Sequence, residues 1–134
     1  MNRFESKTVP ITGAGPGIGY EMARQFLAEG AAVYAADLDP AGAPDGSICL
    51  ATDVTCARAV ADIVTRPVTN TGRLDILCNN AGLASVTDVI NCSSEEWDAT
   101  FAVDTRGSRH QIGPPHMLAQ HHAAIINTLP PPAW

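Results

Sequence analysis

Basic residues are scarce in this sequence. Its 134 residues include 8 lysines and arginines against 14 acidic residues, which gives a formal net charge of −6 at pH 7. An acidic surface repels nucleic acid and anionic membranes, so we expect neither as a partner. No apolar run approaches the ~18 residues that cross a bilayer, and Glu5 and Lys7 stand too close to the N-terminus for a signal peptide. These absences predict a cytoplasmic protein.

Cysteine and histidine are also few, and neither is arranged as a metal site. The cysteines show no Cys-x-x-Cys pairing, and the spacing of the histidines puts successive ones on different faces of a helix. The residues concerned are Cys49, Cys56, Cys78 and Cys92, and His110, His116, His121 and His122. We expect reduced, mostly buried thiols, solvated histidines and no metal. The single lysine, Lys7, excludes a Walker phosphate loop, which needs Gly-Lys-Ser/Thr.

Apolar residues are plentiful, at 46%, and so are glycines near the N-terminus. Residues 8–19 (TVPITGAGPGIG) form a short apolar strand that leads directly into a turn with four glycines. After Gly17 the pattern becomes helical and stops at Gly30, with one apolar face made of Ile18, Met22, Ala23, Phe26 and Leu27. The free N–H groups and the dipole of such a helix point at the turn. This stretch therefore predicts a site for a pyrophosphate.

A second strand, residues 31–36 (AAVYAA), leads into Asp37, eighteen residues after Gly19. An acidic residue at the end of the second strand is where a carboxylate binds the ribose hydroxyls of a dinucleotide. The alternative is a plain strand–helix–strand unit in which Asp37 only begins a turn. The combination of glycine turn and acidic residue favours the dinucleotide.

The rest of the chain continues to alternate strands with helices. Residues 37–46 contain too much proline and glycine for more than a helical turn. The further predicted strands are residues 47–51, 74–78 and 123–127. A parallel sheet with right-handed crossovers follows from this alternation, so the predicted fold is α/β, a Rossmann-like doubly wound sheet of about five strands.

Two further helices are expected between these strands. The first runs from residue 56 to about 65, capped by Thr55 and ended by Pro67. The second is long and begins after Ser93 as N-cap, with Trp97 and Phe101 expected in the core. It should weaken or kink at four helix-breaking residues, Gly107, Gly113, Pro114 and Pro115.

Several segments together resemble the short-chain dehydrogenase/reductase family of the classical type. They are residues 12–19 (TGAGPGIG), 53–54 (DV), 79–82 (NNAG) and 95–98 (EEWD), and the resemblance extends from about residue 7 to 128. It implies binding of a nicotinamide dinucleotide and hydride transfer between that cofactor and an alcohol or carbonyl substrate. The glycine turn combined with Asn-Asn-Ala-Gly is highly specific to this family.

The resemblance also assigns cofactor-binding roles to individual residues. The turn would hold the pyrophosphate and the adenosine side through Gly13, Gly15, Pro16, Gly17, Ile18 and Gly19. Asp53 and Val54 would flank the adenine, while Asn80, Ala81 and Gly82 would line the path toward the nicotinamide ribose. Asp37 would repel the 2′-phosphate of NADP, and no arginine near it in sequence offsets this repulsion. We therefore expect NAD(H) over NADP(H).

The catalytic residues of the family are where this sequence departs from it. The family uses a Tyr-x-x-x-Lys pair, a serine and an asparagine. Here Tyr20 and Tyr34 are followed four residues later by Arg24 and Leu38, and no serine follows the fifth strand. Asp104 stands at the asparagine position and has lost the donor capacity of the amide. The sequence thus predicts no catalytic residue.

We therefore expect residues 1–128 to be an incomplete, NAD(P)-binding domain of this family, with 129–134 as an irregular proline-rich tail and the fifth strand as an uncovered edge. The first hypothesis is that this chain is the cofactor-binding part of an oxidoreductase and is inactive by itself. A small alcohol or ketone would be its substrate only if a complete site exists. The alternative is a non-catalytic nucleotide-binding or interaction module. The ending fits a truncation, a reading-frame change or a genuine short variant, and the chain could pair with itself or with an intact relative.

Overall fold

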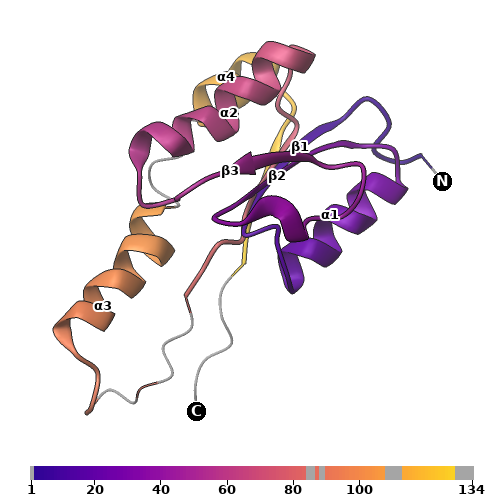
Figure 1. Cartoon of the computed structure of the whole chain (residues 1–134). Helices are drawn as coiled ribbons and strands as arrows, with labels where there is room; N and C mark the ends of the chain where they lie inside the picture. The colour runs from indigo at the N-terminus through magenta and orange to yellow at the C-terminus, as the bar shows by residue number, and fades with distance from the viewer. Residues whose placement is uncertain (1, 84–86, 88–89, 108–112, 129–134) are drawn as a thin grey trace.

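The computed structural model describes residues 2–83, 87, 90–107 and 113–128, and these form one sheet with helices on both of its faces (Figure 1). The strands are β1 (Thr8–Thr12), β2 (Ala32–Asp37), β3 (Ile48–Ala51), β4 (Ile76–Asn79) and β5 (Ala124–Asn127). All their pairings are parallel, and the sheet order is β3-β2-β1-β4-β5. The predicted Rossmann-like α/β fold is confirmed. The predicted tail, residues 129–134, lies outside the described residues.

The sheet order reverses direction at β1, because the chain moves from β1 to β2 and β3 on one side and then to β4 and β5 on the other. At such a point the chain leaves the neighbouring strands β1 and β4 toward opposite faces of the sheet, and a crevice lies at the carboxyl ends of the strands. All five residues of β1 are buried, as expected for the central strand of a parallel sheet. The glycine turn therefore begins at the centre of the molecule.

Pro10 shortens the hydrogen-bonded ladder between β1 and β4. The N–H of Asp75 donates to the carbonyl of Thr8 at 3.0 Å, so the backbone of Thr8 faces β4. Backbone direction alternates along a strand, which puts the nitrogen of Pro10 on the same side, where it has no hydrogen to donate. The β1–β4 ladder is accordingly limited to the pair Ile11 and Cys78, whereas β1 and β2 pair along five residues.

Helix α1 (Ile18–Ala28) covers one face of the sheet, and α2 (Ala57–Thr71) and α4 (Gly113–Gln120) cover the other (Figure 1). Met22, Phe26 and Leu27 of α1 pack against a cluster that includes Val9, Ile11 and Val33. Ile18, predicted on the same apolar face, is instead 65% exposed at the start of the helix. The opposite face buries the apolar side of α2 against β2, β3, β4 and α4 through Tyr34, Leu50, Ile63, Val64, Leu77 and Met117.

The prediction for α2 is wrong at both ends. Its N-cap is Cys56, because the hydroxyl of Thr55 donates to the Asp53 carboxylate at 2.7 Å instead of capping the helix. Pro67 lies inside the helix, which continues to Thr71 and closes on a left-handed Gly72. Pro67 is buried together with Val60, Ile63 and Val64. Burial of this apolar face outweighs the hydrogen bond that the proline removes.

The long helix predicted after Ser93 is interrupted. The Ser93 side chain caps α3 (Ser94–Phe101) by accepting from the N–H of Glu96 at 3.1 Å, as expected. The π-helical segment η2 (Ala102–Gly107) follows, and α4 resumes at Gly113. Helix α3 extends away from the sheet (Figure 1), so Trp97 and Phe101 are 53% and 46% exposed and pack on each other. The prediction that these two aromatic residues lie in the core is wrong.

The four cysteines are free thiols, but the prediction that they are mostly buried is correct for only some of them. Cys78 is fully buried in β4, and burial raises the pKa of its thiol to about 12. Cys49 and Cys56 are exposed, because β3 lies at an edge of the sheet and residue 56 lies at the beginning of a helix. Among the described residues no helix has the length and apolar character needed to cross a bilayer.

Candidate dinucleotide site

The glycine turn connects Thr12, the last residue of β1, to Ile18, the first residue of α1. Gly17 precedes the helix with a φ of 87°, a conformation that favours glycine, and no side chain caps the helix. A Cβ on Gly19 would lie 2.0 Å from the carbonyl oxygen of Gly13, so the turn can fold back on the helix only without a side chain there. The first N–H groups of α1 consequently face the turn, which suits an anion.

Asp37 approaches this turn from the end of β2. Its Oδ2 accepts a hydrogen bond from the N–H of Gly15 at 3.0 Å, and its Oδ1 accepts one from the N–H of Asp39 at 3.2 Å. A Cβ on Gly15 would stand 2.9 Å from Oδ2. The backbone of the turn and the Asp37 carboxylate at the end of β2 are therefore in direct contact. A larger residue at position 15 would push them apart.

The Asn-Asn-Ala-Gly segment after β4 is tied to the same turn. The Thr12 hydroxyl accepts from the N–H groups of Asn80 and Ala81 at 3.0 and 3.1 Å. The Asn80 amide donates to the carbonyl of Gly13 at 3.0 Å. A Cβ on Gly13 would lie 2.8 Å from the Cα of Ala81, so the two loops are in contact through their backbones. These contacts set the distance between the loops that leave β1 and β4.

Two residues that had no binding role in the sequence prediction complete this arrangement. The Thr128 hydroxyl, just after β5, donates to Oδ1 of Asn80 at 3.0 Å. Oδ1 of Asp104 in η2 accepts from the N–H of Leu83 at 2.9 Å and lies beside Gly82. Asp104 thus uses the acceptor capacity that an aspartate shares with asparagine. It braces the end of the Asn-Asn-Ala-Gly segment.

Asp53, after β3, forms a small local turn. Its Oδ1 accepts from the Thr55 hydroxyl at 2.7 Å and from the Thr55 N–H at 2.8 Å. The hydrogen bonds from the Thr55 side chain and backbone hold the pKa of the Asp53 carboxyl below its usual range. The carboxylate is therefore charged at neutral pH. At the neighbouring strand end, the Thr52 N–H donates to the carbonyl of Asp37 at 2.7 Å.

The loops that follow β1, β2, β3 and β4 enclose one pocket together with η2. Predicted site residues that line it are Gly13, Asp37, Asp53, Val54, Ala81 and Gly82. Residues that the sequence prediction missed are Leu38, Thr52, Leu83 and Val103. The first three adjoin predicted residues in sequence, and Leu38 is 76% exposed despite its size, which is a signal for a binding surface. Only the tertiary structure brings Val103 to this place.

Five of the six remaining predicted residues lie elsewhere on the turn, and the sixth, Asn80, lies in the loop after β4. Pro16, Gly17 and Ile18 are exposed on its solvent side and do not line this pocket. Gly15 and Gly19 are buried, where they permit the close backbone approaches already described. The structure therefore separates the predicted set into a group that forms the pocket and a group that surrounds the first turn of α1.

The pocket lining is acidic. Asp37 and Asp53 both line it, and no lysine or arginine is among the described residues of its wall. The single lysine is engaged elsewhere: Lys7 lies just before β1, at the end opposite the glycine turn, and its ammonium stands 3.4 Å from Asp75. An acidic wall favours neutral hydroxyl donors over a phosphate.

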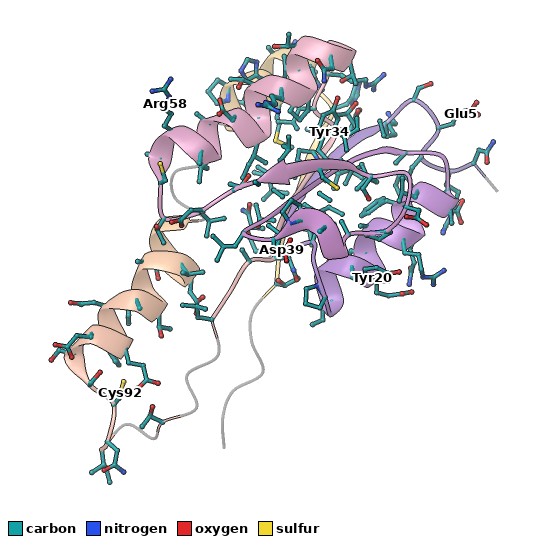
Figure 2. All side chains as sticks on the ribbon, in the orientation of Figure 1. Glu5, Tyr20, Tyr34, Asp39, Arg58 and Cys92 are labelled. Atoms are coloured by element: carbon teal, nitrogen blue, oxygen red, sulfur yellow. The ribbon has the colours of Figure 1, made fainter. Side chains whose placement is uncertain are left out.

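Neither tyrosine is placed as a proton donor to this pocket. Tyr34 is 1% exposed in the core beneath α2, and Tyr20 lies on α1, on the other face of the sheet (Figure 2). Tyr34 is a packing residue of the core, whereas Tyr20 is partly exposed. Within the described part of the chain, no group of three or more histidine, cysteine or acidic residues could hold a metal ion.

Comparison with known proteins gives the same picture. A family model described as short chain dehydrogenase matches residues 7–129. The 3-oxoacyl-(acyl-carrier-protein) reductase of Thermotoga maritima is 31% identical over 93% of this chain and 56% of its own length. The meso-2,3-butanediol dehydrogenase of Serratia marcescens is 36% identical over 94% of this chain and 54% of its own length.

Solved structures agree with these relatives. A short-chain dehydrogenase/reductase from Burkholderia xenovorans superposes with a TM-score of 0.87 at 30% identity, over 95% of this chain and 57% of that one. A 3-ketoacyl-(acyl-carrier-protein) reductase from Brucella melitensis, complexed with NADH, superposes with a TM-score of 0.83 at 32% identity, over 92% and 57%. This chain therefore belongs to the short-chain dehydrogenase family and spans about half the length of the curated relatives it matches.

Proposed function

We propose that this chain is the NAD(H)-binding portion of an oxidoreductase that acts on an alcohol or carbonyl substrate. Residues 1–128 form the binding domain in this proposal. The cofactor, when bound, supplies the hydride chemistry. The residues of this chain bind and orient its adenosine and pyrophosphate parts.

One observation carries the proposal: the Asp37 carboxylate touches the backbone of Gly15 at the edge of the pocket lined by Asp53 and Val54. The pyrophosphate of a dinucleotide would lie at the N-terminus of α1, with its adenosine in the pocket and its ribose hydroxyls on Asp37. The glycines fit this arrangement, because a Cβ at position 13 would collide with Ala81 and one at position 15 with the Asp37 carboxylate. A family relative has been crystallised with NADH, which supports the same choice of ligand.

The acidic wall supports NAD(H) over NADP(H). A carboxylate accepts hydrogen bonds from both ribose hydroxyls, but it repels a 2′-phosphate. The described wall offers no basic side chain to offset this repulsion. Asp53, whose lowered pKa keeps it charged, adds to the repulsion from the side of β3.

We propose that the chain has no dehydrogenase activity by itself. A proton donor is needed where the carbonyl oxygen becomes an alkoxide. Tyr34 is buried in the core, and Lys7 is paired with Asp75 at the far end of β1. These placements favour a second candidate, a nucleotide-binding or interaction module without catalysis, in which the same pocket binds the dinucleotide. The free thiols, two of them exposed, suit the cytoplasm, where we place the protein.

A titration of the purified chain with NADH and NADPH, followed by nicotinamide fluorescence, tests the proposal. We expect saturable binding of NADH and at least ~tenfold weaker binding of NADPH, a difference of about 1.4 kcal/mol. Turnover is then measured with a panel of alcohols and ketones. If a folded sample does not bind NADH at millimolar concentration, the proposed function is wrong. NADH binding without turnover would support it and would favour the non-catalytic module.

A further inference from the structure

The Asp37 carboxylate is held by backbone donors from two directions. Its Oδ2 accepts from the N–H of Gly15 at 3.0 Å, and its Oδ1 accepts from the N–H of Asp39 at 3.2 Å. Each carboxylate oxygen has two lone pairs, so each keeps one for a further donor. The torsion that turns a carboxylate about its last bond is soft. One donor on each oxygen therefore fixes the plane of the group as well as its position.

Asp39 is held in place by its own side chain. Its Oδ1 accepts from the N–H of Ala41 at 3.2 Å and so caps the short 3-10 helix η1 (Pro40–Gly42). Pro40 stands in the first turn of this helix, where its ring fixes the backbone angle φ. The Asp39 side chain therefore holds the backbone whose N–H reaches Asp37. Figure 2 shows Asp39 in the loop that follows β2.

The far end of this loop is anchored to the body of the domain. The carbonyl of Pro40 accepts from the N–H of Ala43 at 3.0 Å and from the Cys49 thiol of β3 at 3.4 Å. Ala43 packs against the core cluster that α1 covers, and Pro44 is buried. The helix η1 is therefore fixed relative to β3 and α1, and Asp39 connects this fixed support to the Asp37 carboxylate.

The cap itself lies at the surface. Asp39 is exposed, and so are Ala41 and Gly42. Burial of these three residues therefore contributes little to the free energy of unfolding. We expect loss of the cap to leave the fold intact and to loosen only the groups that it holds. An effect on binding can accordingly be separated from an effect on stability.

The orientation of the Asp37 carboxylate matters because a ribose presents two neighbouring hydroxyls. A carboxylate whose plane is fixed can accept one hydroxyl on each oxygen. A carboxylate that rotates freely has to lose this motion when the ribose binds, which lowers the affinity. Asp37 lines the pocket, whereas Asp39 is not among the lining residues. Any effect of Asp39 on ribose binding therefore acts through Asp37.

We propose that Asp39 is a positioning residue of the dinucleotide site, whose cap on η1 holds the Asp37 carboxylate in the orientation that accepts both ribose hydroxyls. This inference rests on the proposed function, because it assigns the ribose to Asp37. The role needs an oxygen acceptor at position 39 and does not need a charge there. An asparagine oxygen can accept from the N–H of Ala41, whereas an alanine has no acceptor.

Displacement of bound NADH by ADP and by 2′,3′-dideoxy-ADP measures what the ribose hydroxyls contribute to binding. The two competing ligands differ only in these hydroxyls, so the ratio of their dissociation constants reports the contact with Asp37. We expect Asp39→Ala to reduce the preference for ADP about threefold and to leave the affinity for the dideoxy ligand unchanged. Asp39→Asn retains the oxygen acceptor and should keep the wild-type preference.

Asp45→Ala is the matched control, because Asp45 is an exposed carboxylate of the same loop and its removal changes the net charge equally. This variant should keep the wild-type preference for ADP. A wild-type preference in Asp39→Ala would overturn the proposal, and so would an equal loss in Asp39→Ala and Asp39→Asn. Equal losses of affinity for the two ligands would also overturn it, because they would report a structural defect and not the orientation of the carboxylate.

Amide hydrogen exchange in the unliganded chain tests the positioning without any dinucleotide. The Gly15 amide is bonded to the Asp37 carboxylate. The neighbouring Ala14 amide donates instead to the carbonyl of Ala36 at 3.2 Å and serves as the internal reference. We expect Asp39→Ala to speed exchange at Gly15 about threefold relative to Ala14, and Asp39→Asn to leave it unchanged.

The exchange result separates the two proposals. Unchanged exchange at Gly15 in Asp39→Ala would refute the positioning role, whether or not the wild-type chain binds NADH. The expected exchange pattern in a chain that does not bind NADH would refute the proposed function and leave the link between Asp39 and Asp37 established.

Discussion

Oδ2 of Asp37 accepts a hydrogen bond of 3.0 Å from the backbone N–H of Gly15, across the gap between the end of β2 and the turn after β1. The contact requires a glycine, because a Cβ at position 15 would lie 2.9 Å from that oxygen. It links the carboxylate proposed for the ribose to the turn proposed for the pyrophosphate. The first two predictions follow from it.

Replacement of Asp37 by Asn tests the choice between the two cofactors. The amide oxygen can still accept from Gly15, but the negative charge that repels a 2′-phosphate is gone. We expect the preference for NADH over NADPH to fall about tenfold, or roughly 1.4 kcal/mol. Asp39→Asn, an exposed carboxylate two residues later, is the control and should keep the wild-type ratio. An unchanged ratio in Asp37→Asn would exclude Asp37 as the discriminating group.

Gly15→Ala tests the close contact between the backbone of the turn and the Asp37 carboxylate. The added methyl group displaces the Asp37 carboxylate from the turn, so we expect NADH affinity to fall at least ~tenfold, measured by fluorescence titration. Gly42→Ala is the matched control, because a Cβ there meets no atom within 4 Å. Equal affinities of the two variants would show that the turn tolerates a side chain, contrary to the geometry.

Asn80→Ala tests the link between the loops after β1 and β4. Asn80 donates to Gly13 and accepts from Thr128, and both bonds measure 3.0 Å. Their loss leaves partly buried polar groups without these partners, which we expect to lower the free energy of unfolding by about 1 kcal/mol in urea denaturation and also to weaken NADH binding. Asn70→Ala, at an exposed position of α2, should change neither measurement. A stable variant with full affinity would contradict the assigned role.

Asp75 makes the free energy of unfolding depend on pH in the acidic range. Burial alone would raise the pKa of its carboxyl, but hydrogen bonds from Arg73 and the Thr8 N–H, with the charges of Arg73 and Lys7, hold that pKa below its usual value. A lowered pKa contributes stability that is present above the unfolded-state value of about 3.9 and is lost as pH falls through the folded-state value. We therefore expect the free energy of unfolding of the wild-type chain to decrease below about pH 4.

Asp75→Asn should remove this part of the acid dependence and destabilise the chain by about 1–3 kcal/mol at pH 7, because Arg73 and Lys7, both partly exposed, lose the carboxylate that they contact. The measurement is urea denaturation across the acidic range. Asp62→Asn, an exposed carboxylate on α2, is the control and should keep the wild-type profile. Parallel profiles for the wild-type chain and Asp75→Asn would show that another carboxyl dominates.

Local patterns in the sequence predicted most elements of the fold. The strands, the glycine turn and the helical turn in residues 37–46 follow from residue type and spacing over a few positions, as does the Ser93 cap. The resemblance to the short-chain dehydrogenase family assigned the binding residues, and their place at the carboxyl ends of the strands is expected of a parallel α/β sheet. Six of the residues so predicted line the same pocket.

The errors arose where distant packing competes with local preference. Pro67 was predicted to end α2, but its burial beside Val64 keeps the helix intact for four more residues. Trp97 and Phe101 were placed in the core because their helix is amphipathic, yet that helix extends away from the sheet and the two aromatic residues pack on each other. No short-range signal reports what lies opposite a helix face.

The sequence by itself determined the parallel α/β fold, the position of the turn after β1 and the acidic residue at the end of β2, because each depends on residue type and on spacing along the chain. The tertiary structure alone decided that Asp37 contacts Gly15 and that Thr128 and Asp104 brace the loop after β4. These features join residues from 21 to 48 positions apart, and such distances are set by how the strands order themselves in the sheet.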